Sequence, residues 1–152
     1  MAVEREIVYW VDVNTGLYYV EQHLQIATYA SVYAANDAVG ARGKLVVPNS
    51  GIIANAKLID PDDDTLALTL HIFKGAFTAV ADNAAYTVGA IDAHLIVTSI
   101  LFDSITDHGG FKQAEEFNIN SHYYVPSGEL FYQCSTTGTP NIANNKEPII
   151  IL

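Results

Sequence analysis

The chain has 152 residues, of which half are hydrophobic and 16% are charged. This composition excludes a disordered or strongly solvated chain, and the length predicts one domain with a sizeable core. Seven Lys and Arg against 17 Asp and Glu give a formal net charge of -10, and no basic run occurs. Direct binding to nucleic acid or to an anionic membrane surface is therefore disfavoured, and proteins or neutral molecules are the expected partners.

The start of the chain, "MAVEREIVYW", has Glu residues where a signal peptide would have a basic start followed by an apolar stretch. No apolar run approaches the ~18 residues that a membrane-spanning helix needs. We expect a soluble protein that stays intracellular until it assembles with a partner.

The first 30 residues predict a hairpin. The "NTG" at residues 14–16 is typical of a hairpin turn, and residues 17–30 are the expected return strand. We interpret residues 1–16 as an arm or hairpin appended to a single domain over residues 17–152. One face of the arm carries Ile7, Tyr9, Val11 and Val13.

Residues 51–60, "GIIANAKLID", also alternate, and the "DPDDD" at residues 60–64 is a turn by composition. The crowding of its carboxylates and Pro61 favour a solvated turn over a calcium loop, which needs ligands at alternating positions. The residues expected to face inward are Ile52, Ala54, Ala56 and Leu58.

Residues 65–73 show the clearest strand pattern of the chain, with apolar and polar side chains on opposite faces. Residues 94–102, "HLIVTSILF", are apolar on both faces, which suits a central strand or an edge shared with a partner subunit. We favour the central strand. The inward residues expected in the first of these strands are Leu66, Leu68, Leu70 and Ile72.

Two strands are expected near the end of the chain, at residues 128–138, "GELFYQCSTTG", and in the final "EPIIIL". Helix signals are few and short: "NAAY" after Asp82, "IDAHL" at residues 91–95 and "KQAEEF" at residues 112–117. Together these patterns predict an all-β protein, an antiparallel β-sandwich of about seven or eight strands with few short helical turns.

The sequence offers little catalytic chemistry. Cys134 is the only cysteine and lies in a strand-like run, so we expect a small core or half-buried residue. No serine-nucleophile elbow occurs, and "DHGG" at residues 107–110 is interpreted as a tight turn. We expect no enzyme activity, no cofactor and no metal site. The histidines lack metal-ligand spacing; they are His23, His71, His94, His108 and His122.

Tyr supplies 9 of the 16 aromatic residues, and two Tyr pairs put one ring on each face of a strand. An outward Tyr suits protein interfaces and sugar-binding surfaces equally well, and an ordinary amphipathic strand residue is an equal alternative. The residues that we consider as protein contacts are Tyr9, Trp10, Tyr18, Phe77, Tyr123 and Tyr124.

Four short segments, taken in order, resemble a family of small tailed-phage virion proteins, the capsid accessory, decoration or cement proteins. They are "YAANDAVG" at 33–40, "LTLHIF" at 68–73, "DNAAYTV" at 82–88 and "FYQCSTTGTPNI" at 131–142. The resemblance covers roughly residues 20–150. It departs from the family in a longer N-terminal hairpin, residues 3–19, and in an extended segment at 104–129.

The resemblance implies a jelly-roll-like sandwich that binds the outside of an assembled capsid and clamps neighbouring capsomers. It implies the major capsid protein as partner, self-association as a homodimer or homotrimer, and a place on the virion after synthesis in the host cytoplasm. The expected contact surfaces are the N-terminal arm, the connection that follows Lys74 and the segment 104–128. A carbohydrate-binding module using outward Tyr and Trp10, or a tail or baseplate component, are the alternatives.

Overall fold

The fold was taken from a computed structural model, which describes residues 7–11, 18–28, 32–62, 66–142 and 146–152. These residues form twelve strands and one short 3₁₀ helix, η1 (Ala93–Leu95). None of the helical structure in these ranges is long and apolar enough to cross a membrane. The strands are β1 (Ile7–Val11), β2 (Tyr18–Gln25), β3 (Ala38–Val46), β4 (Ser50–Ile53), β5 (Ala56–Asp60), β6 (Leu68–Phe73), β7 (Ile96–Phe102), β8 (Ile105–Asp107), β9 (Lys112–Glu116), β10 (Ser121–Tyr124), β11 (Glu129–Thr136) and β12 (Ile149–Ile151).

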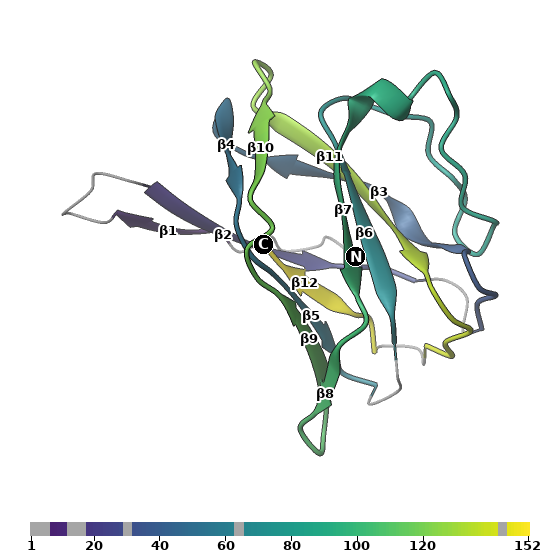
Figure 1. Cartoon of the computed structure of the whole chain (residues 1–152). Helices are drawn as coiled ribbons and strands as arrows, with labels where there is room; N and C mark the ends of the chain where they lie inside the picture. Colours follow the sequence, from purple (N-terminus) through teal and green to yellow (C-terminus); the bar gives the residue numbers. More distant parts are fainter. Residues whose placement is uncertain (1–6, 12–17, 29–31, 63–65, 143–145) are drawn as a thin grey trace.

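The strands form two main antiparallel sheets (Figure 1). Sheet I has the order β1-β2-β12-β5-β9-β8, sheet II has the order β3-β11-β6-β7, and β4 and β10 form a separate pair. Without β1, β4, β8 and β10, eight strands remain, and we number these from 1 to 8 along the chain. Their order is then 1-8-3-6 in sheet I and 2-7-4-5 in sheet II. This is the strand order of a jelly roll, so the predicted fold class is confirmed.

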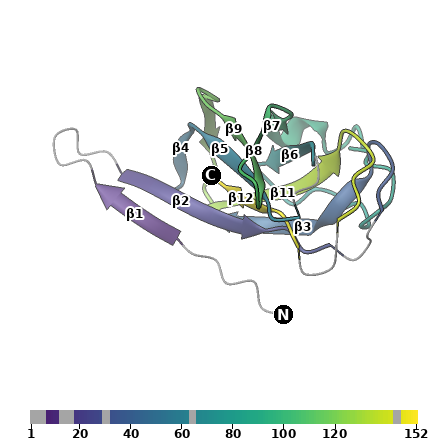
Figure 2. The same ribbon diagram turned by 90° about the horizontal axis from the view of Figure 1, so that it is seen from below.

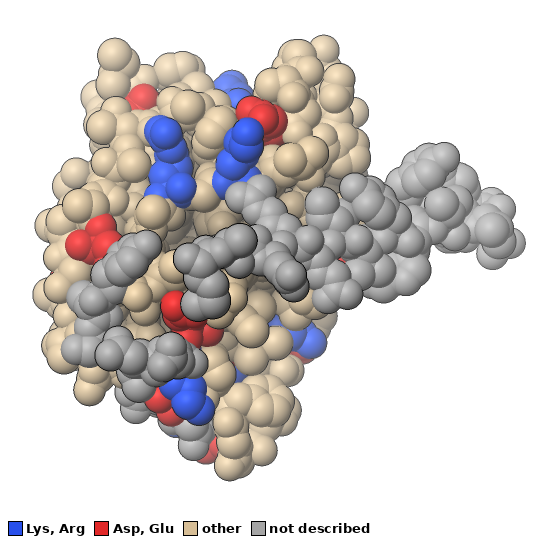
Figure 3. Space-filling model, turned by 180° about the vertical axis from the view of Figure 1, so that it is seen from behind, with Lys and Arg blue, Asp and Glu red and all other residues tan. Residues whose placement is uncertain are grey.

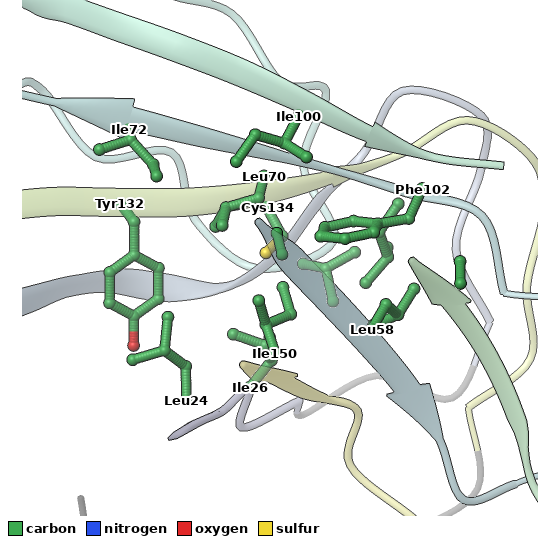
Figure 4. Close-up of a cluster of buried hydrophobic side chains, with 14 of the residues drawn as sticks. Leu24, Ile26, Leu58, Leu70, Ile72, Ile100, Phe102, Tyr132, Cys134 and Ile150 are labelled. Atoms are coloured by element: carbon green, nitrogen blue, oxygen red, sulfur yellow. The ribbon is translucent and has the colours of Figure 1, made fainter. Parts of the chain in front are cut away.

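The interior lies between the two sheets and is built by alternation along the strands. The inward face predicted for Leu66, Leu68, Leu70 and Ile72 is confirmed, because all four side chains are buried. On β11, Leu130, Tyr132 and Cys134 are buried, and so are Gln133 and Ser135 of the opposite face. Figure 4 shows how side chains of both sheets meet in this core. Each large one contributes ~1.5–3 kcal/mol on full burial. Core residues include Leu24, Leu58 and Ile150 from sheet I and Leu70, Ile100, Phe102 and Cys134 from sheet II.

Strand β2 belongs to both the body and a hairpin. Its inner part, His23–Gln25, pairs with β12, whereas its outer part, Tyr18–Gln22, pairs with β1 over all five residues of that strand. The hairpin of β1 and β2 therefore projects from the edge of sheet I, as Figure 2 shows. The predicted "NTG" turn and Val13 lie outside the described residues.

The inward face predicted for residues 51–60 is wrong in its first half. The stretch is divided into β4 and β5 by Ala54 and Asn55, where the alternation changes phase. Ile52 is therefore exposed and Ile53 is buried, while Ala56 and Leu58 face the core as predicted. β4 leaves sheet I here because it pairs with β10 instead.

Residues 96–102 form an edge strand and not the central one that we favoured. β7 pairs with β6 alone and ends sheet II. Its inward Ile100 and Phe102 are buried, while Ile96 and Leu101 are partly exposed. An apolar stretch on both faces does not distinguish a covered strand from an edge strand, because hydrophobicity carries no information on pairing partners.

The segment after β7 contains more regular structure than expected. Residues 105–107 and 112–116 form a hairpin of β8 and β9, so "KQAEEF" is mainly strand and not helix. The "DHGG" turn is confirmed: Gly109 has a φ of 81° and donates its N–H to Asp107 Oδ1 at 2.7 Å. Of the three expected helical turns, only "IDAHL" contains helix, as η1.

Candidate functional site

The segments that carry the phage-protein resemblance lie far apart in the sequence but meet at one end of sheet II. We call residues 33–40, 82–88 and 131–142 the motif junction. Three backbone bonds join its first two segments, from Ala38 N–H to Ala84 O, from Tyr86 N–H to Asn36 O and from Asn83 N–H to Ala38 O, each at 2.8 Å. Outside the strand ladders, three more join the first and third, from Asn36 N–H to Thr136 O at 3.1 Å, from Thr136 N–H to Asp37 O at 2.9 Å and from Tyr33 N–H to Pro140 O at 3.1 Å.

Side chains complete the motif junction. Asp82 Oδ1 accepts the hydroxyl of Tyr33 at 3.0 Å and the backbone N–H of Gly40 at 2.7 Å. Thr136 Oγ1 donates to Ala34 O at 2.7 Å and accepts the N–H of Asp37 at 3.0 Å. These short polar residues satisfy buried backbone groups where the chain turns, which is a structural task and needs no ligand.

The fourth motif, "LTLHIF", joins the motif junction through His71. Its imidazole lies between Ser99 Oγ at 2.8 Å and Ser135 Oγ at 2.9 Å, and it stacks on Tyr86 with ring centroids 4.4 Å apart. Burial lowers the pKa of His71 from 6.5 to about 4, so the ring is neutral at pH 7. A neutral ring held by two hydroxyls lacks the carboxylate that orients a catalytic histidine.

The connection of residues 74–95 covers the outer face of sheet II. Gln133, fully buried on β11, donates Nε2 to Gly40 O and Val80 O and accepts the N–H of Val80. Phe77 stacks on Phe73 at a centroid distance of 3.8 Å, and Arg42 donates to Phe77 O. This covering explains why outward-facing residues of β6 and β11 are buried.

The six predicted contact residues do not form one surface. Tyr9, Trp10 and Tyr18 lie on the hairpin strands, and their side chains are outside the described part of the structure. Phe77 is only 2% exposed, so the expectation of a surface ring there is wrong. Tyr124 is 71% exposed. The ring of Tyr123 packs over Gly51, its cross-strand partner, and burial raises the pKa of its hydroxyl.

The remaining titratable residues were surveyed over the same described ranges. No group of three or more His, Cys, Asp or Glu side chains there could hold a metal ion. Cys134 is fully buried, and this burial raises the pKa of its thiol to about 12, as expected of a core residue. On the face seen in Figure 3, acidic and basic side chains are interspersed and most of the described surface is uncharged.

The structure adds a groove that sequence reasoning missed. It has a volume of about 570 Å³, and its lining comes from β2, β4, the start of β5, β10 and the end of the chain. In Figure 1, the lining strands β2, β4 and β10 lie near the C-terminus of the chain. Its apolar lining residues include Val20, Leu45, Val47, Pro48, Ile52, Ile53, Phe117, Leu130, Ile151 and Leu152.

Two charged side chains that line the groove form an ion pair with each other, and a third, Glu21, contacts a neighbouring histidine. Lys57 Nζ lies 2.7 Å from Glu115 Oε1, and His23 Nε2 lies 2.5 Å from Glu21 Oε1. Gln22, which also lines the groove, is only 6% exposed. Its Nε2 donates to Val46 O at 2.9 Å, while its Oε1 is buried and has no hydrogen-bond partner among the described residues. The one feature of the sequence that could have indicated the groove is the change of phase in the apolar–polar alternation at Ala54 and Asn55.

These features define a jelly-roll β-sandwich with a projecting hairpin and a groove beside it. No family model matches the chain, and no curated protein matches it. Among solved structures, the crystal structure of Caldicellulosiruptor saccharolyticus CBM27-1 in complex with mannohexaose is similar at 10% identity. The match covers 98% of this chain and 79% of that chain, with a TM-score of 0.34. A likeness at this level does not bear on the function of the chain.

Proposed function

We propose that the chain is a structural virion protein that binds the outside of a tailed-phage capsid and stabilises it, as a decoration or cement protein. The observation that carries this proposal is the convergence of the four resembling segments, which share hydrogen bonds and ring contacts although they span residues 33–142. The four segments thus form one connected unit of the fold, and the proposal rests on their joint resemblance to this family.

The surface features fit this role. A jelly roll with a projecting hairpin offers sheet edges and loops to a broad, repeated surface. Self-association as a homodimer or homotrimer would multiply weak contacts with the major capsid protein into strong binding. The net charge of -10 would keep a coated particle soluble.

Co-sedimentation with expanded, undecorated shells tests the proposal. The purified protein is expected to bind with a fixed number of copies per shell, and a variant lacking residues 1–16 is expected to bind more weakly. A matched preparation of unexpanded shells serves as control. If no copies bind at micromolar protein, the proposal is wrong. Binding to isolated tails or baseplates instead would assign the chain to that part of the virion.

A carbohydrate-binding role is a second candidate, favoured by the groove and by the exposed ring of Tyr124. Stacking of a sugar needs an accessible aromatic face. Tyr123 packs over Gly51, which leaves Phe117, 62% exposed, as the accessible ring of the groove lining. Glycan-array binding that is lost in Phe117→Ala or Tyr124→Ala would support this role over capsid binding.

A further inference from the structure

The connection of residues 74–95 lies over His71. This histidine alternates with the inward Leu70 and Ile72, so it is on the outer face of sheet II. Tyr86 of the connection stacks on its imidazole, with ring centroids 4.4 Å apart and an interplanar angle of 14°. Gln133, the cross-strand partner of His71 on β11, bonds to Val80 of the same connection. The connection therefore separates one face of the imidazole from water.

No carboxylate contacts this imidazole in the described part of the chain. Its Nδ1 lies 2.8 Å from Ser99 Oγ of β7, and its Nε2 lies 2.9 Å from Ser135 Oγ of β11. A hydroxyl can accept a hydrogen bond from a protonated ring, but it has no negative charge to balance the proton. A proton on His71 would therefore place an uncompensated charge beneath the connection.

The charged and titratable groups on the elements around His71 do not supply that balance. Strand β7 has no charged residue, and on β11 Glu129 lies 2.7 Å from Lys44 while the thiol of Cys134 is part of the core. Lys74, just after β6, and His94 of η1 are exposed. The described carboxylates of the connection bond elsewhere: Asp82 accepts from Tyr33 and Gly40, and Asp92 accepts from Thr78.

Tyr86 gives a second reason for this part of the connection to open. Its side chain is 7% exposed, and its hydroxyl is buried with no hydrogen-bond partner among the described residues. A buried hydroxyl without a partner destabilises the closed position, because water would satisfy it. The bonds that hold Tyr86 are its N–H to Asn36 O, at 2.8 Å, and Asn36 Nδ2 to its own O, at 3.3 Å. Breaking them leaves the ladders of sheet II intact.

We propose that a proton on His71 opens the connection at Tyr86, so that acid exposes the outer face of β6 and β11 while the sandwich stays folded. Burial lowers the pKa of His71 from 6.5 to about 4 in the closed position. The open form, in which water reaches the ring, therefore binds the proton first as the pH falls below 6.5. Neutral pH keeps the connection closed. This inference does not depend on the proposed function, since no shell takes part in it.

Hydrogen exchange of the isolated protein, corrected for the intrinsic rate at each pH, measures the opening. Between pH 7.5 and 4.5, the protection of peptides from residues 80–90 is expected to fall at least about fivefold, because the open form gains the proton. At pH 4.5, peptides containing β5 or β12 should remain at least about tenfold better protected than these, since the sandwich is still folded. Equal protection of both regions would mean global unfolding and would overturn the proposal.

His71→Gln tests the origin of the response, because Gln forms hydrogen bonds but takes no proton in this range. The protection of residues 80–90 should then be the same at both pH values. The matched control is His94→Gln, an exposed histidine at the end of the same connection, and it should respond like the wild type. Circular dichroism at pH 7.5 establishes that both variants are folded.

A measurement on the wild type needs no variant. The titration of the His71 ring, followed by NMR, should have the same midpoint as the loss of protection at residues 80–90. Two different midpoints would contradict the proposal. A response in His71→Gln equal to that of the wild type would also contradict it and would assign the opening to the carboxylates of the connection.

Discussion

Aromatic rings cover two glycines on paired strands. Tyr132 of β11 lies over Gly43 of β3, its register partner, and Tyr123 of β10 lies over Gly51 of β4 in the same way. A Cβ on Gly51 would be 2.6 Å from the hydroxyl oxygen of Tyr123, and a Cβ on Gly43 would clash with the ring of Tyr132. Glycine is needed at both positions because the ring takes the space of a side chain.

Gly43→Ala is therefore expected to lower the free energy of unfolding by about 1–3 kcal/mol, because Tyr132 is buried and its ring has no free space. Chemical denaturation measures the difference. Gly110→Ala is the matched control, since a Cβ there would meet nothing within 4 Å, and its effect should stay within ~0.5 kcal/mol. Equal effects of both substitutions would contradict this account.

His71 is expected to make stability depend on pH. Its pKa of about 4 in the folded chain lies below its ordinary value of 6.5, so the unfolded chain binds the proton first. The stabilisation is complete above pH ~6.5 and is lost as pH falls toward 4, by about 1–2 kcal/mol with allowance for partial exposure. Denaturation curves at pH 7.5 and 4.5 measure this. In His71→Gln the dependence should be smaller, and an unchanged dependence would assign it to other groups.

At the scale of elements, the connection 74–95 has almost no regular structure apart from η1, and bonds from side chains hold it in addition to a few backbone bonds. Gln133 binds it at Val80, Asp82 binds it to Tyr33 and Gly40, and Asp92 accepts the N–H of Thr78 at 2.9 Å. The bond from Thr78 also lowers the pKa of Asp92. A connection without its own helix or strand depends on such bonds, because its backbone groups lack ladder partners.

Asp82→Ala is expected to lower the free energy of unfolding by about 1–3 kcal/mol, because the Gly40 N–H and the Tyr33 hydroxyl lose a charged acceptor. Limited proteolysis after Lys74 should become faster as the connection loosens. Asp103→Ala is the control, since Asp103 is exposed and accepts only the Ser104 hydroxyl, at 3.4 Å, among the bonds described. An Asp82 variant as stable and as protease-resistant as the control would contradict this role.

At the scale of the whole molecule, the stability of the sandwich is expected to depend little on the hairpin of β1 and the outer part of β2. Among the described residues, the core is built from Leu24 onward, and β2 pairs with β12 at His23–Gln25, which are not the residues that pair with β1. The body should therefore fold without the first strand.

A chain lacking residues 1–16 is expected to unfold in one cooperative transition, with a midpoint within a few degrees of the full chain. Circular dichroism and thermal denaturation of both chains measure this. Loss of cooperativity, or a midpoint lower by tens of degrees, would mean that β1 is part of the folding unit. In that case, weaker shell binding by the chain lacking residues 1–16 would reflect its loss of folding and would not test whether the arm contacts the shell.

The sequence by itself determined the strand face with strict alternation at 66–72, because burial of one face requires period two. It also indicated the small core cysteine and the "DHGG" turn, which depend on local chemistry. Only the tertiary structure decided that 96–102 is an edge strand, that Phe77 is buried and that 104–129 contains strands. It alone showed the motif junction and the groove. Each of these depends on which distant segments pair, and the pairing partner of a strand is not encoded in its own hydrophobic pattern.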